Sequence, residues 1–128
     1  MAKPPIIVNE KGDVELYETI PDAEVALEPI DVENDEFTIF DSDGLVIVPR
    51  VAADRIHVEL RDSSPQEFEP DQLQATLRRF LSQLDEELTG ASEDEIWRSR
   101  LPALIEMIRS VQARPRRSRF RIWPWGRS

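Results

Sequence analysis

The chain has 128 residues, which suits a single domain, and 40% of them are hydrophobic, enough to form a folded core. It contains no cysteine, which excludes disulfide bonds, thiolate metal ligands and a cysteine nucleophile. A net charge of -10 disfavours contact with phosphate backbones and favours basic partners. The first residues lack the apolar run of a secretory signal, and no run of apolar residues is long enough to span a membrane. We therefore expect a soluble cytoplasmic protein.

The first half of the chain alternates apolar and polar residues, as strands with one exposed face do. Two such strands are predicted, over residues 6–8 and 13–18, on either side of a glycine-containing turn. A short helix is expected to run to residue 27 with Thr19 as its N-cap. It must end before Pro29, because the residue preceding a proline avoids helical geometry.

A polar corner at residues 31–36 leads into a predicted hairpin. Residues 37–40 and 45–48 are rich in strand formers and flank an Asp-Gly turn, a strong hairpin signal because glycine accepts a positive φ. Pro49 is expected to end the return strand, and residues 55–60 alternate again as a fifth strand.

Two amphipathic helices are predicted in the second half of the chain. The first is expected to be capped by Asp71 and closed by Gly90. The second begins at a capping-box pattern over residues 92–95 and contains Pro102, which should kink it or split it in two. The sequence therefore predicts an α+β domain over residues 1–113, with an antiparallel sheet of about five strands and the helices packed on one face.

Residue patterns with a known chemistry are missing from the sequence. His57 is the single histidine, and its expected place on the exposed face of a strand favours a surface residue over a general base. The four glycines are too scattered for a phosphate loop. The segment from Asp41 fails the calcium-loop spacing, because its twelfth position is Ala52 instead of a glutamate. We therefore expect a non-enzymatic protein with no catalytic residue, metal ion or cofactor.

Charge is distributed unevenly along the chain. Residues 1–70 carry eighteen acidic against five basic residues, whereas residues 114–128 carry six arginines and no acid. An acidic surface steers basic proteins toward itself and suppresses association with wrong partners. We predict that exposed acids of the first half bind a basic protein; these are Glu15, Glu18, Asp31, Glu33, Asp35, Glu36, Asp41 and Asp43. The alternative is that these acids are merely solvated and serve solubility.

Residues 4–44 combine a strand, a Gly-Asp turn, a second strand leading to a capped short helix, a Leu-Glu-Pro step, an Ile-Asp-Val start of a strand, and an aspartate-rich hairpin. In this order of elements, the segment resembles a group of small bacterial immunity proteins of polymorphic toxin systems. The resemblance implies a stoichiometric inhibitor that binds a neighbouring toxin domain. It also implies an acidic surface complementary to a basic nuclease or deaminase.

Residues 114–128 form a basic C-terminal tail that contains tryptophan. The residues predicted to make its contacts are Arg116, Arg117, Arg119, Arg121, Trp123 and Trp125. Cations interleaved with aromatic rings are typical of peripheral membrane and nucleic-acid contacts, so a protein tethered in this way is the alternative function. The same composition suits a segment packed on its own acidic domain, or a frayed terminus. Because the first half is strongly acidic, we expect the domain itself to be the nearest target.

Overall fold

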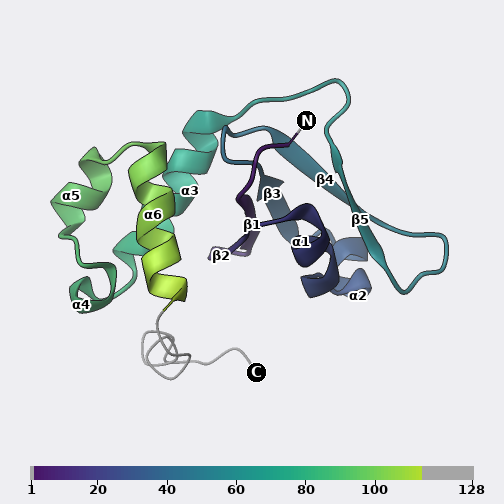
Figure 1. Ribbon diagram of the computed structural model, residues 1–128, viewed down its shortest axis with the longest axis horizontal. Coiled ribbons are helices and arrows are strands. Elements are labelled where there is room, and N and C mark those ends of the chain that lie inside the picture. The colour runs from purple at the N-terminus through teal and green to yellow at the C-terminus, as the bar shows by residue number, and fades with distance from the viewer. Residues whose placement is uncertain (1, 114–128) are drawn as a thin grey trace.

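Five strands form one antiparallel sheet within residues 2–113, the part of the chain that the computed structural model describes (Figure 1). They are β1 (Ile6–Glu10), β2 (Asp13–Tyr17), β3 (Phe37–Phe40), β4 (Val46–Val51) and β5 (Val58–Asp62). Their order across the sheet is β2-β1-β3-β4-β5, and every neighbouring pair is antiparallel. The predicted α+β fold with a five-stranded antiparallel sheet is confirmed.

Short helices follow β2, and longer helices fill the second half of the described chain. They are α1 (Ile20–Ala26), α2 (Pro29–Glu33), α3 (Pro70–Ser82), α4 (Glu86–Thr89), α5 (Glu93–Arg98) and α6 (Leu101–Gln112). Two predicted caps are confirmed: Thr19 Oγ1 accepts the Asp22 N–H at 3.1 Å, and Ser92 forms a capping box with Glu95. Among residues 2–113, no helix has the length and apolar character needed to cross a membrane.

The sheet lies between two helical layers, because successive residues of a strand point to opposite faces. Ile7 and Phe40 pack with the buried side chains of α3 and α6, whereas Ile6 and Ile39 pack with Ala23 of α1. The structure differs here from the predicted arrangement, in which all helices shared one face. Figure 1 shows α1 and α2 on the other side of the sheet from α3, α5 and α6. Each face therefore has its own hydrophobic core.

Helix α2 stands where the sequence predicted a polar corner and the start of a strand. Pro29 occupies its first turn, where a missing N–H leaves no helical bond unmade. The N–H groups of Asp31 and Val32 both donate to the Glu28 carbonyl at 3.1 Å. The proline that ends α1 thus also begins a second helix.

Strand β4 continues through Pro49, which was predicted to end it. Strand β3 pairs with β4 only at Val46 and Ile47, so the proline lies where β4 has β5 as its one neighbour and its missing N–H leaves no bond to β3 unmade. Strand β5 begins at Val58, later than predicted, because Arg55 adopts a φ of +63° in the preceding turn.

The second half departs from the prediction at the helix ends. Pro102 splits the predicted second helix, as expected, and lies in the first turn of α6. The predicted first helix stops at Ser82, and Gly90, with a φ of +69°, closes the separate short helix α4. The N-cap of α3 is Glu69 instead of Asp71, because Pro70 already occupies the first helical position.

On each edge strand of the sheet, a side chain forms hydrogen bonds with the backbone. On β2, the Gln112 side chain accepts the Leu16 N–H at 2.5 Å and donates to the Leu16 carbonyl at 3.2 Å. On β5, the Glu24 carboxylate accepts the Leu60 N–H at 2.7 Å. Gln112 therefore takes the place that the backbone of a neighbouring strand would take, and it fixes the last turn of α6 against β2.

Candidate functional site

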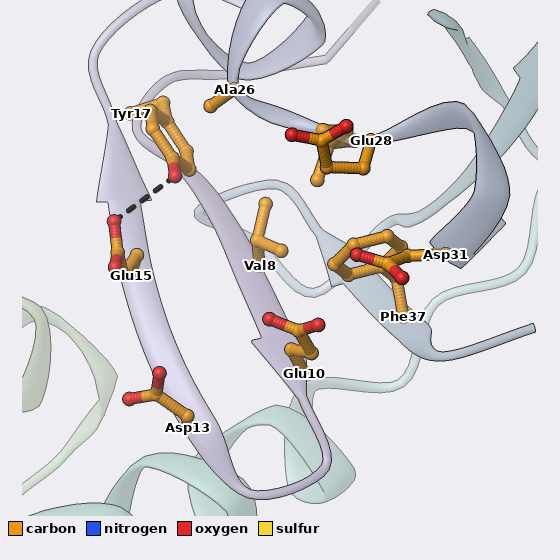
Figure 2. Close-up of a pocket in the computed structure, with 10 residues that line it drawn as sticks. Val8, Glu10, Asp13, Glu15, Tyr17, Ala26, Glu28, Asp31 and Phe37 are labelled. Atoms are coloured by element: carbon orange, nitrogen blue, oxygen red, sulfur yellow. Dashed lines mark hydrogen bonds between the residues drawn. The ribbon is translucent and has the colours of Figure 1, made fainter. Parts of the chain in front are cut away.

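A groove of about 350 Å³ lies between the β1–β2 hairpin and the junction of α1 with α2 (Figure 2). We call it the acidic groove; its lining residues are Val8, Glu10, Asp13, Glu15, Tyr17, Ala26, Leu27, Glu28, Asp31 and Phe37. Five of these ten residues are acids and none is basic. Within residues 2–113, the lining of the acidic groove is thus rich in carboxylates and contains no basic side chain.

Strand β2 supplies one side of the acidic groove through the alternation of its side chains. Val14 and Leu16 are buried against α3 and α6, so Asp13, Glu15 and Tyr17 project from the opposite face. Figure 2 shows Glu15 and Tyr17 on one side of Val8, and the α2 residues on the other. The same pattern that builds one core therefore lines the groove with acids.

The short helix α2 supplies the other side of the acidic groove. Glu28 is its N-cap, and Asp31 lies in its first turn. Phe37 begins β3 directly after this helix and packs against the α1-side core. The groove thus depends on α2, an element that the sequence did not predict.

Aromatic rings accompany the carboxylates of the acidic groove. The Tyr17 hydroxyl donates to Glu15 at 3.0 Å, which holds that carboxylate beside the ring. Tyr17 and Phe37 are both half-buried. A guanidinium or ammonium group is the natural ligand of such a surface, because it pairs with carboxylates and is attracted to aromatic faces.

Three carboxylates converge at one end of the acidic groove. Oxygens of Glu10, Asp31 and Glu36 lie within 4.8 Å of one another, a spacing that would admit a shared cation. The Lys11 ammonium is 3.0 Å from Glu36 and already provides a positive charge there. Exposed acids are often this close without a metal ion, so we assign no metal to the trio.

Two members of the trio differ in how readily they hold a proton. Burial, the hydrogen bond with Glu36 and the neighbouring negative charges raise the pKa of Asp31 above its ordinary value of 3.8. The hydrogen bond from Lys11 lowers the pKa of Glu36 below 4.5, against an opposing effect of burial. Of these two carboxyl groups, Asp31 is therefore the one that takes up a proton first as the pH falls.

We expect Asp31→Asn to raise the melting temperature at pH 7 and Glu36→Gln to lower it. A carboxyl with a raised pKa in the folded state weakens the fold once ionised, and this penalty disappears as the pH falls through that pKa. Glu36 has the opposite sign: its contribution is present above pH 4.5 and is lost as the pH falls through its lowered pKa. Thermal unfolding followed from pH 3 to pH 8, with Asp35→Asn as the neighbouring control, measures both effects. Shifts of the same sign in the two variants at pH 7 would contradict this assignment.

Several predicted binding residues come together at the acidic groove. Glu15 and Asp31 line it, and Glu36 adjoins Asp31. Glu33 lies on α2, where its carboxylate is 3.3 Å from an arginine of the β4–β5 turn, and Asp35 is exposed just beyond that helix. The structure thus gathers these five acids around α2 and β2.

Two other predicted binding residues point elsewhere and are engaged in ion pairs. Glu18 accepts two bonds from the Arg109 guanidinium, at 3.0 Å each, and links the end of β2 to α6. Asp43 lies in the β3–β4 turn, 3.0 Å from the Lys3 ammonium. Neither residue belongs to the acidic groove.

The expectation that Asp41 is one of the exposed acids is wrong. The residue is only 2% exposed, and its carboxylate accepts the backbone N–H groups of Lys3, Asp43 and Leu45 at 2.8–2.9 Å. Since its oxygens serve its own turn, Asp41 is a structural residue. Charge alone did not distinguish it from the exposed aspartates of the same hairpin.

The sequence analysis missed five functional candidates: Glu10, Asp13, Tyr17, Glu28 and Phe37. The alternation of β2 contained a signal for two of them, because it places Asp13 and Tyr17 on the same face as Glu15. The other three have no such local signal. They reach the groove only through the pairing of β1 with β3 and the presence of α2.

His57 is a surface residue, as predicted, although it lies in the turn before β5. Its ring is 74% exposed, and Nδ1 contacts the Asp54 carboxylate. Backbone donation from Ile56, together with the bonds from His57, lowers the pKa of Asp54 to about 2. This Asx-type turn shapes the β4–β5 connection and lies outside the lining of the acidic groove.

The tail contacts predicted from the sequence lie outside the described residues. They involve Arg116, Arg117, Arg119, Arg121, Trp123 and Trp125. Comparisons of the chain with models of protein families, with curated proteins and with solved structures find no match. The resemblance of residues 4–44 to immunity proteins stays a prediction, and function is inferred from the geometry and charge of the acidic groove.

Proposed function

We propose that this chain is a non-enzymatic binding protein whose acidic groove receives basic side chains of a protein partner. The observation that supports this most directly is the composition of the lining, which among the described residues has five acids, two aromatic rings and no basic residue. Arginine suits such a hollow best, because its planar guanidinium bonds carboxylates in pairs and stacks on aromatic rings.

Electrostatics favours the acidic groove over the surrounding acidic surface. An exposed ion pair contributes only about 0–1 kcal/mol, so isolated carboxylates give little affinity. In the groove, one cation of a partner would contact several carboxylates and an aromatic ring at once. Because the groove is partly shielded from solvent, these attractions would be stronger than on an open surface. The chain's overall negative charge adds long-range steering, which raises association rates about 10- to 1000-fold at low salt.

A toxin domain is the partner class that the resemblance of residues 4–44 favours. In that interpretation, the acidic groove covers a basic region that a nuclease or deaminase uses for nucleic acid. Glu15 and Asp31 line the acidic groove, and Glu36 lies beside it. This supports the interpretation, because the binding energy of an interface is usually concentrated in a few neighbouring residues.

The test is affinity capture with full-length protein from the cell that produces it. A groove variant carries Glu10→Gln, Glu15→Gln and Asp31→Asn, and a charge-matched control carries Glu67→Gln, Glu69→Gln and Glu87→Gln, three exposed acids outside the groove. We expect the unmodified chain and the control to capture a basic protein in a 1:1 ratio, and the groove variant to lose it. Association should also slow as salt shortens the Debye length from about 30 Å at 0.01 M to 8 Å at 0.15 M.

Equal capture by the groove variant and the control would refute the proposed site. Capture of nucleic acid or anionic vesicles in place of a basic protein would favour the alternative of a tail-tethered protein. Circular dichroism of all three proteins establishes beforehand that each variant is folded.

A further inference from the structure

We infer that the outer side of helices α1 and α2, together with the β4–β5 turn, docks a basic amphipathic helix of the protein partner. We call this surface the apolar face; its side chains are Val25, Ile30 and Ile56. The inference rests on the proposed function in one respect, since it assigns the same basic partner to a surface beside the acidic groove. It adds a requirement that charge alone does not set: the partner must present apolar side chains next to its cations.

The apolar face holds the three most exposed large hydrophobic side chains among residues 2–113. Val25 is 88% exposed, Ile56 71% and Ile30 65%, whereas the next in order, Phe68, is 55% exposed. Single exposed apolar residues are common on any protein, but a group of them on one part of the surface marks an interaction site.

The two short helices expose these side chains because their inner sides are already filled. Ala23 is buried on the sheet side of α1, and Val25, two positions further, lies about 200° around the helix axis. In α2, Val32 packs against the same core, and Ile30 lies two positions before it. Val25 and Ile30 therefore point away from the sheet, where they add nothing to the core.

An ion pair brings the β4–β5 turn to α2 and so places Ile56 near Ile30. The Arg55 guanidinium lies 3.3 Å from the Glu33 carboxylate. Ile30 and Glu33 are three positions apart and are neighbours on the helix surface, and Ile56 directly follows Arg55. Figure 1 shows α1 and α2 beside β5, away from α3, α5 and α6. The apolar face thus spans elements that lie together in the fold.

The charges around the apolar face call for a basic occupant. Residues 20–36, which include α1 and α2, contain seven acids and no basic residue. Asp22, Glu28 and Asp35 are exposed and form no ion pair within residues 2–113. Arg55 lies at the edge of the face, and Glu33 already neutralises it. A second copy of this chain would bring the same acids against each other in a two-fold contact, and anionic lipids would be repelled as well.

A helix suits this surface better than an extended strand. A strand would add to β5, but the Glu24 carboxylate accepts the Leu60 N–H at 2.7 Å on that edge, beside α1. A helix needs no backbone bond from its site, and it presents apolar side chains in a row at spacings of three and four residues. Cations on the flanks of such a helix would meet the acids that border the apolar face.

Glu28 connects the apolar face with the acidic groove. It lies at the junction of α1 with α2, between Val25 and Ile30 in the chain, and it lines the groove. A helix docked on the apolar face can therefore place an arginine into the neighbouring groove. The two surfaces together recognise one partner by charge and by apolar contact.

Titration calorimetry of the full-length chain with two synthetic peptides of equal charge tests the inference. One peptide is an amphipathic helix with leucine along one side and arginine on its flanks, and the other has glutamine in place of every leucine. We expect the leucine peptide to bind about tenfold more tightly, with a negative heat-capacity change from buried apolar surface.

The variant of the apolar face carries Val25→Gln, Ile30→Gln and Ile56→Gln. It should bind both peptides equally and keep the melting temperature of the unmodified chain, because the three side chains are exposed. The control carries Val48→Gln and Phe68→Gln, two exposed apolar side chains outside the apolar face, and should retain the preference for leucine.

Equal affinity of the unmodified chain for both peptides would overturn the inference, and so would a preference for leucine that survives in the variant of the apolar face. Dimerisation of the chain alone that this variant abolishes would also overturn it, since the occupant would then be a second copy. Its failure is distinguishable from that of the proposed function. Partner capture that needs the groove but is unchanged in the variant of the apolar face removes the inference and leaves the proposed function standing. A preference for leucine that needs the apolar face, together with capture that ignores the groove variant, has the reverse meaning.

Discussion

Replacement of Asp41 by alanine is expected to lower the free energy of unfolding by about 3–5 kcal/mol, since each buried donor left without its acceptor costs about 1–3 kcal/mol. Three backbone N–H groups lose their acceptor at once, and the one from Leu45 is fully enclosed. The loss is less than three full penalties, because Lys3 and Asp43 are exposed and water can reach their N–H groups. Such a change is a large share of the 5–15 kcal/mol that typically stabilises a domain.

Denaturant unfolding measures this loss, and Asp43→Ala is its control. Asp43 is exposed, and its pair with Lys3 is a surface ion pair worth about 0–1 kcal/mol. If the two alanine variants were destabilised alike, the assignment of Asp41 as the organiser of the turn would fail. Asp41 was also predicted to contact a partner, but it does not line the acidic groove. A large loss of stability in Asp41→Ala alone would therefore assign Asp41 to the fold and not to partner binding.

Gly44→Ala is the second change with a large expected effect, a loss of about 3–5 kcal/mol from backbone strain and overpacking together. Gly44 adopts a φ of +90°, and an added Cβ would lie 2.7 Å from backbone atoms of Pro70. The two backbones are also joined by a 2.8 Å bond from the Glu69 N–H to the Gly44 carbonyl. The close approach fixes the start of α3 on the β3–β4 turn, and neither backbone can move away without breaking that bond.

Gly12→Ala provides a matched control for Gly44→Ala. Gly12 has a similar φ of +98°, but an added Cβ would meet nothing within 4 Å. Its substitution isolates the cost of backbone strain, about 1–3 kcal/mol. Thermal and denaturant unfolding of both variants should show the greater loss at Gly44. Equal losses would mean that the contact with Pro70 contributes nothing.

Local sequence signals predicted the elements whose formation depends on a few neighbours. Thr19 and Ser92 cap their helices with side chains three residues away, and Pro102 acts on its own turn. The strands were found because alternation follows from a sheet with distinct faces. These signals were enough for the fold class and for the five-stranded sheet.

Features that depend on distant residues could not be predicted in the same way. Pro29 suited both the end of one helix and the start of another, and only packing of α2 beside the sheet decides between them. Pro49 was judged a strand end, since the sequence does not show that β3 pairs with β4 at only two positions.

The acidic groove was predicted in its charge but not in its shape. Glu15 and Asp31 were identified because acids are abundant in the first half, and the same reasoning wrongly included the buried Asp41. Composition does not report burial or the position of an aromatic ring. Tyr17 and Phe37, which make the site more than a charged surface, became visible only in the fold.

The bond between Gln112 and Leu16 bears on how copies of this chain can assemble. Open edge strands are templates for strand exchange and filament growth, and proteins avoid these routes by covering their edges. Here the cover is a helix terminus, so a second copy cannot add to β2 at Leu16 until the last turn of α6 unwinds. The local stability of this helix end therefore controls whether a second copy can reach the backbone of Leu16.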